Sequence, residues 1–167
     1  MSGISHIKVS RCNAQQLLGN PGFDAGTISP WTAGPRVLAN ISEGVPAQAG
    51  KWLAWLDGYG KAHTDTLAQT VTIPANCKSA VFTYWVEVNS STTNKANKLV
   101  LEVLNCSGAV VQTVPVATAA NRGSRYVEYT TNLASYIGQK ITVKFVGTEV
   151  NGGNTSFFED SYGLNVH

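Results

Sequence analysis

The chain has 167 residues, of which 13% are charged, and a formal net charge of +2 at pH 7. This length is enough for one domain with a hydrophobic core. The 12 Lys and Arg residues form no basic run, which argues against a surface for nucleic acid or an anionic membrane. No segment reaches the roughly 20 apolar residues of a membrane-spanning helix. The first residues lack a signal-peptide core, so we expect a processed secreted protein or a segment of a longer one.

Strand signals follow one another along most of the chain. Residues 1–16 carry only a weak period-two alternation around Ile7 and Val9, and we expect an N-terminal arm, a linker or an edge strand there. From residue 17 onward, apolar segments alternate with polar turns, which predicts one all-β sandwich domain over residues 17–167. The expected strands are 36–41, 51–56, 66–73, 79–88, 98–105, 109–116, 125–131, 140–147 and 156–166. A short helical turn is expected at 133–137.

Alternation also sorts the two faces of two expected strands. The expected core side chains are Phe82, Tyr84, Val86 and Val88 in the first strand and Ile141, Val143 and Phe145 in the second. The opposite face of the first strand is polar but also carries Trp85. A large aromatic side chain on a polar face is either covered by another part of the chain or belongs to a binding surface.

The sequence contains no recognisable catalytic set. His6, His63 and His167 lie in the arm, in a loop and at the last position. No nucleophile elbow, zinc-protease motif or phosphate-binding glycine loop is present in the sequence. We therefore expect a non-catalytic protein.

Exposed aromatic residues with polar neighbours point to a glycan site. Sugar rings stack their apolar faces on aromatic rings, while nearby polar groups bind the hydroxyls. Trp85 with Glu87 fits this pattern, and Tyr126 with Glu128 repeats it on a second strand. Lys144 is expected to complete the same face.

Acidic residues near both ends of the sandwich suggest a metal site. Asp24 follows a tight turn near the first strand, and Asp160 lies in the last strand. Calcium takes oxygen ligands from such carboxylates and from loop carbonyls, so one ion would join the two strands. Asp57 and Asp65, in a loop-rich stretch, are weaker candidates. The alternative is that Asp24 caps a turn and Glu159 or Asp160 is solvated.

The three cysteines are Cys12, Cys77 and Cys106, without the spacing of a zinc site. Cys77 follows an expected strand and Cys106 precedes a turn. A Cys77–Cys106 disulfide at one pole of the sandwich is one interpretation, and three unpaired thiols are the other.

Six short motifs follow one another along the chain. They are NPGFD at 20–24 with Trp31 after it, GKWLAW at 50–55, LAQTVTIPA at 67–75, FTYW at 82–85, LASYIGQ at 133–139 and TSFFED at 155–160. In this order they resemble the galactose-binding-like jelly-roll modules appended to secreted bacterial peptidases and glycoside hydrolases. The resemblance implies a carbohydrate-binding-module-like jelly roll of two antiparallel sheets. It also implies a structural calcium ion, whose ligands map onto Asp24 and Asp160.

The function that we expect is a non-catalytic carbohydrate-binding module of a secreted protein. It would hold an attached enzyme or a cell surface near polysaccharide. The alternative is an assembly subunit of an extracellular filament or virion surface, in which residues 1–16 add a strand to a neighbouring copy. A hydrolase with an unrecognised carboxylate pair is a third hypothesis.

Overall fold

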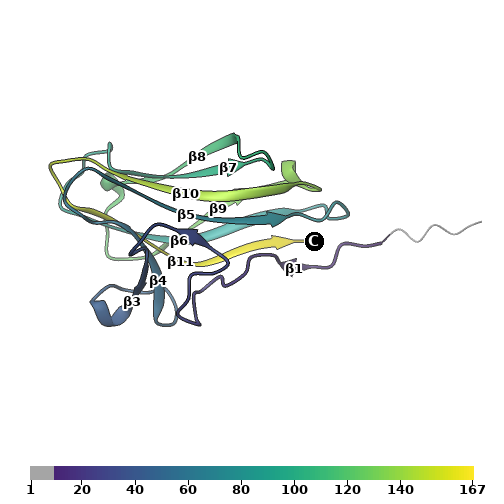
Figure 1. Cartoon of the computed structure of the whole chain (residues 1–167), viewed down its shortest axis with the longest axis horizontal. Helices are drawn as coiled ribbons and strands as arrows, with labels where there is room; N and C mark the ends of the chain where they lie inside the picture. The colour runs from purple at the N-terminus through teal and green to yellow at the C-terminus, as the bar shows by residue number, and fades with distance from the viewer. Residues whose placement is uncertain (1–9) are drawn as a thin grey trace, which may run out of the picture.

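The computed structural model describes residues 10–167, which form two antiparallel sheets joined by turns and loops (Figure 1). Sheet A has the strand order β3-β4-β11-β6-β9, with β1 also paired to β11, and sheet B has the order β2-β5-β10-β7-β8. The strands of sheet A are β1 Gln15–Gln16, β3 Leu38–Asn40, β4 Trp52–Asp57, β6 Ala80–Ser90, β9 Val127–Asn132 and β11 Thr155–Val166. Those of sheet B are β2 Thr32–Ala33, β5 His63–Thr72, β7 Lys98–Leu104, β8 Val110–Thr118 and β10 Lys140–Glu149.

The jelly-roll sandwich predicted from the sequence is therefore confirmed. Each of the nine expected strands overlaps an observed strand. The helical turn is the 3₁₀ helix η3 (Ala134–Tyr136), and two further 3₁₀ turns are η1 (Ile41–Glu43) and η2 (Ala119–Asn121). The short strand β2 was not expected.

The main core lies between the two sheets. All seven side chains predicted to face inward from β6 and β10 are buried there. They meet the aromatic rings of Phe23, Trp31 and Tyr162, which come from the N-terminal loops and β11. The Phe145 ring, for example, contacts Tyr84 with the ring centroids 5.0 Å apart. Alternation predicts these faces well because the side-chain period of a strand is two.

A second, smaller core covers part of the outer face of sheet A. The connection between β3 and β4 folds back over this face and buries Val45 against Leu53 and Phe158. The Tyr126 hydroxyl donates a 2.7 Å hydrogen bond to the Pro46 carbonyl and ties the connection to the start of β9. We call residues 44–50 the covering loop. It divides the outer face of sheet A into a covered centre and accessible margins.

The N-terminal segment is joined to the sandwich by a disulfide. Cys12 bonds to Cys77, and Cys106 is free and exposed. The Cys77–Cys106 interpretation is thus wrong, because Cys106 lies in the β7–β8 turn at the surface of sheet B. Gln15 and Gln16 pair with the end of β11, which brings the expected arm onto sheet A. Ile7 and Val9 lie outside the described residues.

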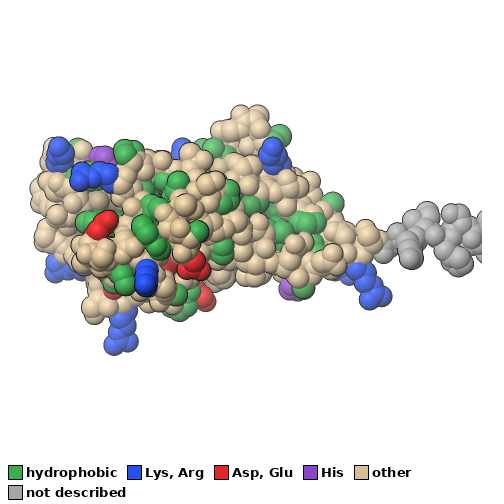
Figure 2. Space-filling view, turned by 60° about the horizontal axis from the view of Figure 1, so that its bottom comes forward, with side chains coloured by type: hydrophobic (Ala, Val, Ile, Leu, Met, Phe, Trp, Pro, Cys, Tyr) green, Lys and Arg blue, Asp and Glu red, His purple; other side chains and the backbone are tan. Residues whose placement is uncertain are grey.

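The surface carries few charges. Lys and Arg side chains are spread in small separate groups over the face in Figure 2. Among residues 10–167, no helix is long and apolar enough to cross a membrane.

Candidate functional site

Two neighbouring cavities meet at Trp55, at one margin of the outer face of sheet A. The larger, of about 410 Å³, runs between the covering loop and the ends of β4, β6 and β11. The smaller, of about 210 Å³, continues toward Arg36 and Tyr59. Trp55, Glu43 and Gly58 line both. We call the two cavities together the Trp55 groove.

The Trp55 ring is held in a fixed orientation. Its indole Nε1 donates a 2.9 Å hydrogen bond to the Ser156 hydroxyl, and its ring packs on Phe158 with the centroids 5.8 Å apart. Phe158 is its direct partner across the β4–β11 pair. Gly58 lies close beside it, at a φ of 89° that glycine adopts without strain. The result is a partly exposed, preorganised aromatic wall.

Polar side chains surround this wall. Asn89, Ser91 and Asn154 line the larger cavity, and Asn89 pairs with Ser156 across the β6–β11 ladder. Arg36 and Glu43 supply one charge of each sign at the smaller cavity. An aromatic surface edged by amides, hydroxyls and a few charges can bind the ring faces and hydroxyls of a sugar.

Four of the five predicted ligand-binding residues do meet on the outer face of sheet A. Trp85 on β6 pairs with Glu128 on β9 and with Asp160 on β11. Trp85 is partly exposed and Glu128 is exposed. They form an accessible strip at the margin opposite the Trp55 groove.

The other predicted ligand residues are less accessible. Glu87 is buried opposite Phe158, and burial raises the pKa of its carboxyl. Tyr126 is half-buried, and its hydroxyl is engaged by the covering loop. Lys144 lies on β10 in sheet B, paired with Ala68 and Glu102, and does not share a face with the others. Alternation predicted its side of the strand but could not tell which sheet the strand joins.

The predicted calcium pair contacts the covering loop. The carboxylate of Asp160 accepts 3.0 Å hydrogen bonds from the backbone N–H groups of Gln48 and Ala49, and a third from the next residue. Burial raises the pKa of Asp160 to about 6, and the charge of Asp24 adds to this shift. Asp24 is exposed and lies beside Gly50. Both carboxylates therefore face the same loop, one buried and one in solvent.

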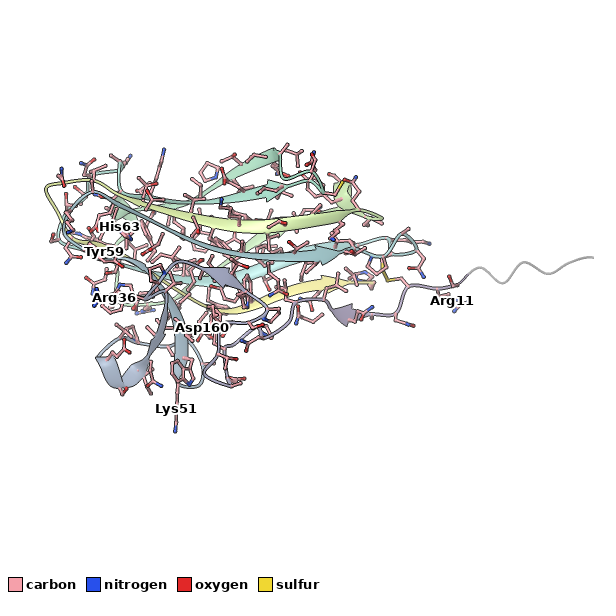
Figure 3. All side chains as sticks on the ribbon, viewed as in Figure 1. Arg11, Arg36, Lys51, Tyr59, His63 and Asp160 are labelled. Carbon is pink, nitrogen blue, oxygen red and sulfur yellow. A yellow bond between two sulfur atoms is a disulfide. The ribbon has the colours of Figure 1, made fainter. Side chains whose placement is uncertain are left out.

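A second cluster of acidic side chains lies at the pole of the sandwich beside the Trp55 groove. Ligand atoms of Asp57, His63 and Asp65 lie within 4.8 Å of one another, so these side chains could hold a metal ion. Burial, together with the charges of Asp65 and Glu149, raises the pKa of Asp57 to about 8. Figure 3 shows His63, Tyr59 and Arg36 together at this pole.

The Trp55 groove was not among the sites predicted from the sequence. The KWLAWL segment does place its two tryptophans on opposite faces, since Trp52 packs against the main core and Trp55 against the small one. The signal that could have identified Trp55 is the adjacent turn at 57–60, because turns at strand ends often carry binding residues. The covering loop gave no sequence signal.

The comparisons with known proteins agree with the fold. No protein-family profile matches the chain, and no curated protein matches its sequence. Among solved structures it is similar to TmCBM61, solved in complex with β-1,4-galactotriose, with a TM-score of 0.68 and 21% identity over 92% of this chain and 99% of that one. It has the β-sandwich fold of carbohydrate-binding modules.

Two further structures share this fold. The CBM22-1 xylan-binding domain of Paenibacillus barcinonensis Xyn10C has a TM-score of 0.59 and 15% identity, over 95% of this chain and 97% of that domain. A family 16 carbohydrate-binding module has a TM-score of 0.58 and 16% identity, over 87% of this chain and 96% of that module. At these identities the similarity establishes the architecture.

Proposed function

We propose that the chain is a non-catalytic carbohydrate-binding module that binds a glycan in the Trp55 groove. The observation that carries this proposal is the fixed, partly exposed Trp55 ring between two cavities with polar walls. The fold supports it, because similar structures include one solved with a galactotriose and one named a xylan-binding domain. The groove is open, so we expect affinities in the micromolar to millimolar range, about 4–8 kcal/mol.

In this proposal one sugar ring stacks on Trp55 while its hydroxyls bind Asn89 and Asn154. The ring needs little rearrangement, because Ser156 and Phe158 already hold it, and this lowers the entropic cost of binding. Arg36 and Glu43 would then contact a second sugar in the smaller cavity.

Binding to a panel of soluble polysaccharides, including β-1,4-galactan and xylan, tests the proposal by affinity electrophoresis and calorimetry. We expect Trp55→Ala to weaken binding at least tenfold, which corresponds to about 1.4 kcal/mol. The matched control is Trp85→Ala, which removes the partly exposed tryptophan at the opposite margin of the outer face of sheet A. If only the Trp85 variant loses binding, the glycan occupies the Trp85–Glu128 strip instead. If the unmodified protein binds no glycan, the proposal fails.

The proposal includes a structural calcium ion shared by Asp24 and Asp160. Calcium prefers carboxylate and carbonyl oxygens, and an ion here would offset the repulsion between the two acids. The fit is supported by Asp160 Oδ1, which accepts one N–H bond among the described residues and so retains a free lone pair. Calcium should raise the melting temperature of the unmodified protein but not of Asp24→Asn. No shift with calcium in the unmodified protein would refute this part.

We also propose that the protein works outside the cell. The Cys12–Cys77 disulfide supports this, because such bonds persist in oxidising compartments. An attached enzyme or cell surface would then be the partner held near polysaccharide.

A further inference from the structure

A pocket of acidic side chains lies between the two sheets at the pole beside the Trp55 groove. Asp57 ends β4 of sheet A, and β5 of sheet B supplies His63 and Asp65. On β10, Gly147 is the partner of Asp65 and Glu149 is the partner of His63. The pocket therefore receives side chains from both layers of the sandwich.

Asp57 is the residue that lacks a partner. Its side chain is 4% exposed, and neither carboxylate oxygen has a hydrogen-bond partner among residues 10–167. Its φ of 64° turns the end of β4 so that the carboxylate points across to sheet B. A Cβ atom at position 147 would lie 2.8 Å from Asp57 Oδ2, so Gly147 provides the space for this carboxylate.

The other two acids in the pocket have defined contacts. Asp65 Oδ2 accepts a 2.8 Å bond from the Asp57 backbone N–H, and its Oδ1 lies 2.9 Å from His63 Nε2. Glu149 accepts hydrogen bonds from the backbone N–H groups of Tyr59, Gly60 and Thr155. Glu149 thus holds the turn after β4, whereas the Asp57 carboxylate accepts no hydrogen bond from residues 10–167.

A buried carboxylate without a donor is costly, and two more carboxylates nearby increase the cost. A bound cation would offset this energetic cost. We propose that Asp57, His63 and Asp65 form a binding site for one divalent transition-metal ion of the zinc class. Their ligand atoms already lie within 4.8 Å of one another. Bonds of about 2.0–2.2 Å to imidazole nitrogen and carboxylate oxygen would need only small shifts.

The ligand types favour zinc over calcium or magnesium. Imidazole suits zinc and its neighbours, whereas calcium and magnesium prefer sites built from oxygen alone. The His63 side chain is 31% exposed, which leaves one side of the site open to solvent for entry of the ion and for a water ligand. The His63 ring also packs on Tyr59 with the centroids 3.8 Å apart, so the ion would fix the turn that borders the smaller cavity.

Titration of the untagged full chain with Zn²⁺, followed by thermal melting and calorimetry, tests the proposal without any glycan. At zinc concentrations about 100 times Kd, we expect the melting temperature to rise by about 5–10 °C. Co²⁺ should bind with the visible absorption of a cobalt–histidine site. Asp57→Asn keeps the shape of the side chain, and this variant should lose both effects, as should His63→Gln.

The matched control is Asp24→Asn, which alters the separate acidic pair and should keep the zinc response. Absence of a zinc-induced shift in the unmodified protein would overturn the proposal. So would an unchanged zinc response in both Asp57→Asn and His63→Gln, because the ion would then be bound elsewhere. Loss of glycan binding has no bearing on these measurements.

Discussion

Removal of the Cys12–Cys77 disulfide tests both the pairing and the role of the N-terminal segment. The two cysteines are separated by 65 positions. In the chain-entropy treatment, opening a loop of this length increases the entropy of the unfolded chain by about 14 cal/mol/K, or about 4 kcal/mol at 25 °C. The β1–β11 pairing supplies further native contacts for the segment that the substitutions do not remove. We therefore expect Cys12→Ser/Cys77→Ala to lose about 3–4 kcal/mol of unfolding free energy.

Urea unfolding of the oxidised protein measures this loss, and peptide mapping without reductant identifies the pair. Reduction of the unmodified protein should reproduce the effect, which separates the bond from the packing of Cys77. Cys106→Ser is the control and should leave stability unchanged, because Cys106 is free and exposed. Equal stability of the double variant and the unmodified protein would refute the reasoning, as would a large loss in Cys106→Ser.

Three further predictions concern sheet A and its groove. Glu159 is fully buried and its carboxylate oxygens lack partners among the described residues, so Glu159→Met should raise the unfolding free energy by about 1–3 kcal/mol. Burial raises the pKa of Glu159 well above its ordinary value. The stability that the Glu159 carboxyl contributes is therefore fully present below the unfolded-state pKa and is lost as the pH rises. The gain in unfolding free energy from Glu159→Met should grow between about pH 5 and about pH 8 in urea unfolding. A constant or shrinking gain would contradict this. Tyr126→Phe removes the bond to Pro46 and should cost about 1 kcal/mol by the same measurement, with no change counting against anchoring of the covering loop. Gly58→Ala should weaken glycan binding at least tenfold in calorimetry, about 1.4 kcal/mol, because its Cβ would lie 2.8 Å from Trp55 Nε1; unchanged affinity would show that the ring position does not matter.

The fold was largely predictable from the sequence because its signals are local. Period-two alternation located the buried faces of β6 and β10, and polar turns located the strand ends. The order of the strands within each sheet was not predictable in this way. Alternation correctly gives the side of the strand on which Lys144 lies. The sheet to which that strand belongs depends on the pairing of β10 with β5 and β7, which are distant in sequence.

The candidate site was harder to predict because it depends on a loop that packs on the sheet. Glu87 is buried and Tyr126 is hydrogen-bonded to the covering loop, although both lie on the predicted face. The same loop leaves Trp55 as an accessible wall of the groove. Asp57 was identified only as a weak candidate, since its burial results from the φ of one residue and the absence of a side chain at Gly147.

Both described chain ends lie at one pole of the sandwich. The carbonyl of His167 accepts hydrogen bonds from the backbone N–H groups of Lys78 and Ser79, next to the disulfide at Cys77. The Trp55 groove lies at the other pole (Figures 1 and 3), about 30 Å away along strands of ten residues such as β10. A polypeptide joined after His167 would emerge at the pole opposite the groove and leave the groove facing outward. Under the proposed function, the groove would then be free to sample a polysaccharide surface at the effective concentration set by such a tether.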